Sequence, residues 1–72
     1  MHERSTSQLT SATEENLKKI AGLQLNSSQQ EMASQIKQYM DQSKTAAAAG
    51  DLDRAHNLAM KAHLLSEDLV KP

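Results

Sequence analysis

The sequence predicts an all-α protein built around an antiparallel helical hairpin, with one further helix in front. Apolar residues recur at helical spacing through both long segments of the hairpin. The run Ala46–Ala49, made of strong helix formers, is followed directly by Gly50 and Asp51. Gly50 can adopt the left-handed conformation that closes a helix, and Asp51 can cap the next one. The expected helices span residues 8–24, 27–49 and 51–70, in a three-helix arrangement.

Composition limits how this chain can be stabilised. Its 72 residues make one domain at most, and a domain of this size buries too little surface to be more than marginally stable without help. There is no cysteine, so disulfides cannot contribute, and Tyr39 is the only aromatic residue. Helix packing or self-association must therefore supply the stability. We expect residues 1–7 to be a flexible N-terminus and residues 8–72 to form a single helical domain.

Charge and hydropathy exclude two classes of partner. The formal net charge is −1 and no segment is strongly basic, so the sequence lacks the electrostatic signature of a nucleic-acid-binding protein. No apolar run approaches the ~20 residues of a membrane span, which predicts no membrane insertion. The N-terminus lacks the apolar stretch of a signal peptide. This indicates a cytoplasmic protein if the chain is whole, and leaves a periplasmic location open if it is an excised domain.

The first helix has an ambiguous start and a narrow apolar stripe. Ser5-x-x-Gln8 and Ser11-x-x-Glu14 both fit the capping-box pattern. Asn16 shares the side of the helix that carries the stripe, and it either fixes the register of a helix pair or lies at the edge of the packed face. The stripe consists of Leu9, Leu17, Ile20 and Leu23.

The hairpin helices have one broad apolar face each, and the second carries an additional patch. Met60 and Leu64, four residues apart, lie together on the face expected to be wet, flanked by His56 and His63. The pair indicates either a second neighbour for this helix or two unrelated surface residues. The expected core residues are Tyr39, Ile36, Ala55, Ala59, Ala62 and Leu65. The candidate interaction residues are Leu9, Leu17, Ile20, Met60 and Leu64.

The hairpin, over about residues 36–69, resembles a single tetratricopeptide repeat. With Gly50 at the turn, Tyr39 falls on the large aromatic position, and small residues fall on the small positions of both helices. Bulky aromatics are replaced by Ala46 and Ala59, and the usual proline is absent near Glu67. The matching residues are Tyr39, Ser43, Ala55, Ala62 and Leu65. The resemblance implies a helical protein-binding hairpin, although such repeats normally stack in threes.

A second resemblance covers the pattern A-x-x-x-GD-x-x-RA-x-x-LA-x-KA-x-x-L, which runs from Ala46 to Leu65. It looks like the tail segments of bacterial envelope-associated proteins. The resemblance implies a bacterial source and an association with the cell envelope.

The chemically interesting residues predict no catalytic or metal site. His56 and His63 are about 10 Å apart along a helix, too far to share one metal ion. Ser34-x-x-Lys37 matches a motif of serine enzymes, but no companion motif is present and Ser34 falls on the wet face. We therefore expect no enzyme activity and no cofactor.

These observations favour a non-catalytic protein–protein interaction or assembly module that binds a protein partner or itself, as a homodimer. The alternative is a small regulatory protein, antitoxin-like or anti-factor-like, whose N-terminal helix becomes ordered on its target.

Overall fold

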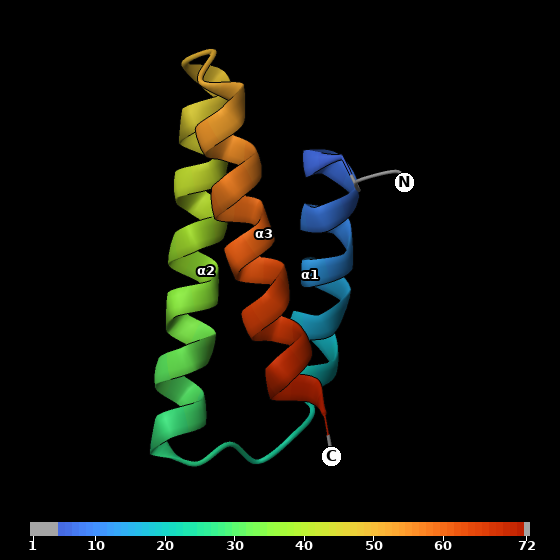
Figure 1. The fold of residues 1–72 in the computed structure, drawn as a ribbon. Coiled ribbons are helices and arrows are strands. Elements are labelled where there is room, and N and C mark those ends of the chain that lie inside the picture. Colours follow the sequence, from blue (N-terminus) through green and yellow to red (C-terminus); the bar gives the residue numbers. More distant parts are fainter. Residues whose placement is uncertain (1–4, 72) are drawn as a thin grey trace.

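The computed structural model describes residues 5–71 and confirms the all-α, three-helix arrangement (Figure 1). The three elements are α1 (Thr6–Ala21), α2 (Ser27–Ala48) and α3 (Leu52–Val70). Within the described residues there is no strand. Residues 1–4 of the predicted N-terminal segment and residue 72 of the predicted helical domain lie outside the described residues.

Helix α1 begins and ends earlier than the predicted range of 8–24. Of the two candidate capping boxes, the first is formed: the Gln8 amide donates to Ser5 Oγ (3.2 Å) and the Ser5 amide donates to Gln8 Oε1 (3.1 Å). The helix stops at Gly22, a poor helix former, and the Leu23 amide closes the end on the Ile20 carbonyl (2.9 Å). Ser5 therefore caps α1 and residues 6 and 7 begin it, whereas the sequence predicted a flexible segment there.

Helix α2 starts where the sequence predicts. Asn26 and Gln29 form a reciprocal capping box, with distances of 2.8 and 2.9 Å between each backbone nitrogen and the other residue's side-chain oxygen. Leu25, just before this cap, packs against the main core cluster. The hydrophobic side chain thus seals the point where the connection enters α2.

The turn between α2 and α3 closes as a Schellman motif. Gly50 has φ = +83°, the left-handed conformation that its missing side chain permits. The Gly50 amide donates to the Ala47 carbonyl (3.0 Å) and the Asp51 amide donates to the Ala46 carbonyl (2.9 Å). Asp51 then caps α3, because its Oδ1 accepts from the Arg54 amide (3.3 Å). The second hairpin helix consequently starts at Leu52, one residue after the predicted start.

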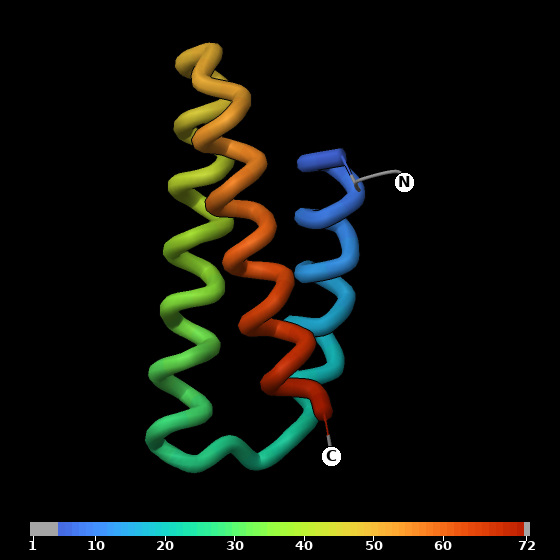
Figure 2. Tube along the Cα trace, viewed as in Figure 1, coloured from blue at the N-terminus to red at the C-terminus, as the bar shows by residue number. Residues whose placement is uncertain are grey.

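The three helices lie side by side, with α3 in the middle (Figures 1 and 2). Helix α2 runs antiparallel to α3, and α1 runs parallel to it. The molecule measures 37 × 26 × 15 Å along its principal axes, so it is elongated and flattened. Helix α1 packs chiefly on α3 and barely on α2.

The core is built mainly from small and aliphatic residues, as predicted. Ile36, Ala59 and Ala62 are fully buried, while Tyr39 and Leu65 are half-buried at the edge of the core. Ser43 donates its Oγ proton to the Ala55 carbonyl (2.7 Å), which holds α2 close to α3 near the turn. The larger core cluster consists of Ile20, Ile36, Met40, Ala62 and Leu69, and the smaller one of Ala46, Ala55 and Leu58.

The two glycines of the chain should respond oppositely to alanine. Gly50→Ala places a side chain in the left-handed region and should lower the free energy of unfolding by about 1 kcal/mol. Gly22→Ala is the matched control: Gly22 has a right-handed helical conformation (φ = −86°) and room for a Cβ, so it should raise that free energy by about 0.5 kcal/mol. Urea denaturation followed by circular dichroism measures both. A neutral Gly50→Ala would contradict the turn geometry.

Candidate interaction surface

Part of the predicted interaction surface is covered by the chain itself. Leu9 and Ile20 are each only 2% exposed, and Leu17 is half-buried against the main core cluster. The narrow stripe of α1 matches one neighbouring helix, and in this fold that neighbour is α3. The assignment of these three leucine and isoleucine side chains to an external surface therefore needs correction: they pack within the chain.

The contact between α1 and α3 is partly polar. Thr13 is fully buried and donates to the Leu9 carbonyl (2.7 Å) in its own helix. The side-chain Nδ2 of Asn16 donates to Ser66 Oγ (3.0 Å), and Ser66 Oγ in turn donates to the His63 backbone carbonyl (2.7 Å). The Asn16–Ser66 bond joins the two helices at one fixed register, as one of the two interpretations of Asn16 predicts.

The two histidines of α3 lie toward α1 and are at least partly covered. His63 is buried, and its Nε2 lies 2.6 Å from Oε1 of Glu67, one helical turn away. His56 is half-buried, with Nδ1 3.4 Å from Thr6 Oγ1. The face expected to be wet is therefore partly covered by α1 at these two positions, because the angle of a residue on a helix does not reveal a second neighbour. Across residues 5–71, no group of three or more metal-ligating side chains is present.

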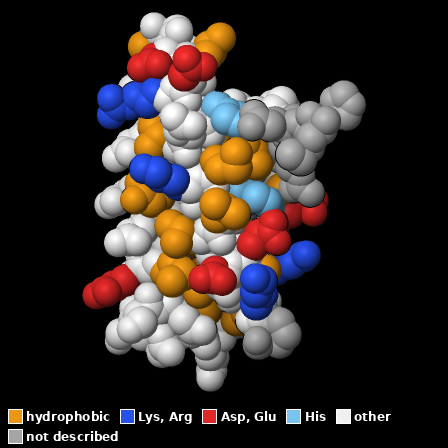
Figure 3. Space-filling view, viewed as in Figure 1, with side chains coloured by type: hydrophobic (Ala, Val, Ile, Leu, Met, Phe, Trp, Pro, Cys, Tyr) orange, Lys and Arg blue, Asp and Glu red, His pale blue; other side chains and the backbone are white. Residues whose placement is uncertain are grey.

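Among residues 5–71, no other helix covers the remaining face of α3. We call it the outer stripe. It holds Leu64, which is 61% exposed, and the half-buried Met60, surrounded by charged side chains. Figure 3 shows this face of the molecule, where hydrophobic side chains alternate with lysine or arginine and with aspartate or glutamate. The outer stripe consists of Asn57, Met60, Lys61, Leu64, Asp68 and Lys71.

The charges of the outer stripe were not singled out from the sequence. Lys61 Nζ lies 6.0 Å from the centre of the Tyr39 ring, which holds the ammonium toward the α2 side of the stripe. Asp68 Oδ1 is 4.0 Å from Lys71 Nζ, and both side chains are about 70% exposed. The sequence does contain this pattern, because Lys61 stands three residues before Leu64 and Asp68 four residues after it.

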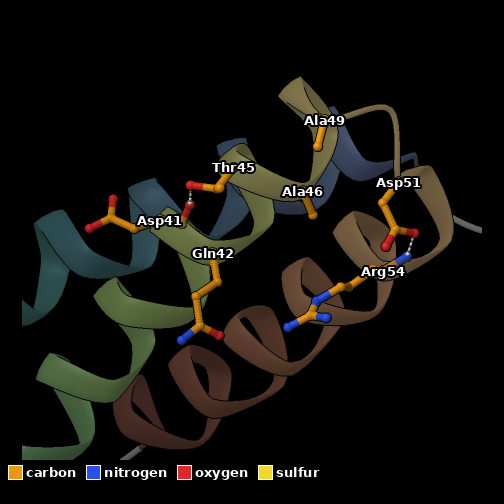
Figure 4. A pocket seen from close by; sticks show the side chains of 7 residues that line it. All are labelled: Asp41, Gln42, Thr45, Ala46, Ala49, Asp51 and Arg54. Carbon is orange, nitrogen blue, oxygen red and sulfur yellow. Dashed lines mark hydrogen bonds between the residues drawn. The ribbon is translucent and has the colours of Figure 1, made fainter.

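A separate groove lies beside the α2–α3 turn, with a volume of about 370 Å³ (Figure 4). Ala46 and Ala49 form its apolar part, and the Asp51 carboxylate is already engaged in capping α3. Its charged lining residues are all exposed to solvent, so the groove lacks the dry surroundings that shift carboxylates toward acid–base work. The lining residues are Asp41, Gln42, Thr45, Ala46, Ala49, Asp51 and Arg54.

Comparison with known proteins adds no assignment. No protein-family model matches the chain, and neither a curated protein nor a solved structure is significantly similar to it. Among the described helices, none is both long and apolar enough to cross a membrane, which agrees with the prediction of no membrane insertion.

Two leucine-to-alanine substitutions should distinguish the core from the outer stripe by their effects on the free energy of unfolding. Leu9→Ala removes a side chain that is 2% exposed and should lower the free energy of unfolding by about 2–5 kcal/mol. Leu64→Ala removes one that is 61% exposed and should change it by less than about 0.5 kcal/mol. Denaturation at low protein concentration, where self-association does not contribute, measures both. Equal effects of the two substitutions would contradict the packing of α1 on α3.

Proposed function

We propose that the chain is a non-catalytic protein–protein interaction or assembly module that binds through the outer stripe of α3. The observation that carries this proposal is the position of Leu64: it is 61% exposed in the middle of the helix that forms the centre of the fold. An exposed leucine at a helix end is ordinary, but Met60 lies next to it one turn away. Together they make an apolar strip with a charged rim, the composition typical of a binding face.

The construction of the hairpin supports the same role. Small residues at the α2–α3 contact bring the two helices close together, so α3 is held firmly by its inner face while its outer face stays free. A binding face on a rigid helix loses little conformational entropy when a partner binds. The resemblance of the hairpin to a tetratricopeptide repeat also favours a protein-binding role.

A regulatory protein whose N-terminal helix folds onto a target is the second candidate. It is favoured by the polar character of the α1–α3 seam, where Thr13, Asn16 and Ser66 replace the aliphatic contacts found between α2 and α3. Polar contacts of this kind are weaker than aliphatic packing, so α1 is the helix that could most easily exchange partners. The two candidates differ in whether α1 is folded in the free chain.

Site-specific photo-crosslinking tests the proposed binding face. A photoreactive phenylalanine analogue at position 64 should yield protein adducts in cells of the source organism, and the same analogue at position 52 should yield few. Leu52 is the matched control because it is also an exposed leucine of α3, 67% accessible, but lies outside the outer stripe. Adducts that are equally rare at both positions would overturn the assignment of the binding face.

A further inference from the structure

We propose that the outer stripe binds a second copy of this chain, with α3 packed antiparallel against α3 and the two-fold axis passing beside Leu64. This inference rests on the proposed function, because it names the partner of the same face. It does not require any residue of α1 or of the turn groove.

The outer stripe runs as a line along α3, with one apolar pair, Met60 and Leu64, near its middle. Asn57, Leu64 and Lys71 recur every seven residues, and Met60 lies between the first two of them. A repeat of seven residues keeps side chains on one line along a helix, which is the geometry by which paired helices meet. The line is about 21 Å long at 1.5 Å per residue, so it can contact another helix over four turns.

Charge complementarity selects the antiparallel orientation. Lys61 and Asp68 are seven residues apart, so they point the same way, and the contact of Lys61 with the Tyr39 ring places both on the α2 side of the stripe. A two-fold axis across Leu64 keeps the α2 sides together and reverses the helix direction. Lys61 of each copy then faces Asp68 of the other, which makes two equivalent ion pairs. In a parallel two-fold pair, the α2 sides of the two copies lie on opposite edges of the contact, so Lys61 of one copy does not reach Asp68 of the other.

The apolar part of the stripe fits the same arrangement. Leu64 of one copy meets Leu64 of the other at the axis, and Met60 of each copy packs beside them. The charged pairs lie at the rim, where they set orientation more than affinity. A second copy of the chain therefore supplies both the apolar side chains for the centre of the stripe and the opposite charges for its edges.

The shape of the chain leaves surface for such a contact. Its accessible surface is 5170 Å², whereas a compact monomer of its mass exposes about 4400 Å². The Cα trace is 15 Å thick in its thinnest direction, and α3 is covered by α2 and by α1 while its outer face stays open. A contact limited to one helix from each copy falls at the low end of interface sizes, so the dimer should be weak and reversible.

Sedimentation equilibrium of the 72-residue chain at low salt tests the pairing. As the protein concentration rises from about 10 µM to about 1 mM, the range in which a weak dimer forms, the chain should pass from monomer to dimer. Lys61→Glu and Asp68→Lys should each weaken the dimer by about tenfold or more, because each places like charges opposite one another at two sites. The double variant Lys61→Glu/Asp68→Lys should restore the wild-type dimer. Circular dichroism checks that every variant keeps its helices.

Single cysteines test the register, since the chain has none of its own. Leu64→Cys should oxidise rapidly to a disulfide-linked dimer, because the two sulfurs meet at the axis. Leu52→Cys, which is equally exposed, should not, because the two copies of position 52 lie roughly 36 Å apart along the helix pair. Asn57→Cys should cross-link with Lys71→Cys in a mixture and not with itself.

The outcomes separate this inference from the proposed function. A chain that stays monomeric to about 1 mM, or a dimer that ignores both charge reversals, overturns the antiparallel pairing. Rapid cross-linking of Leu52→Cys at the rate of Leu64→Cys overturns it as well. If position 64 nevertheless photo-crosslinks to a different protein, the interaction module stands and only its partner changes. If the dimer forms with the expected charge pattern, both proposals are supported together.

Discussion

The packing of α3 against both other helices is the constraint on which the rest of the structure depends. Helix α2 contacts it over most of its length and α1 contacts it from the other side, while α1 and α2 barely meet. Removing α3 would leave two helices with apolar faces and no partner. Because α3 has two neighbours in one layer, its inner face and side are covered and its outer face is not. The candidate binding surface is a direct consequence of this arrangement.

The two contacts of α3 differ in chemistry. Against α2, the small side chains of Ala55, Ala59 and Ala62 allow close approach, and Ser43 adds a hydrogen bond to the backbone of α3. Against α1, buried hydroxyl and amide groups form a chain of hydrogen bonds through Asn16 and Ser66. Buried polar groups add specificity of register at low net energy. The hairpin therefore provides the stable unit, and α1 completes it in one defined register.

The hairpin could be predicted from the sequence because its signals are local. Gly50 and Asp51 specify the turn within two residues, and the capping boxes mark helix starts within four. The position of α1 could not be predicted in the same way. A stripe containing Leu9 and Ile20 shows that α1 has a neighbour but does not say which one, and the same uncertainty made His63 look exposed. The outer stripe was only half recognised, since Met60 and Leu64 stood out as apolar residues, whereas the lysine and aspartate beside them gain meaning only when the free face of α3 is known.

Amide hydrogen exchange on the dilute, monomeric chain tests most directly whether α3 holds α1 within the same molecule. The packing described above predicts that the amides of residues 12–20 exchange at least about a hundredfold more slowly than in an unstructured peptide, close to the behaviour of α3. Exchange of these amides at unstructured rates, with α2 and α3 still protected, would contradict it. That result would make α1 a segment that orders on binding and would favour the regulatory candidate over the assembly module.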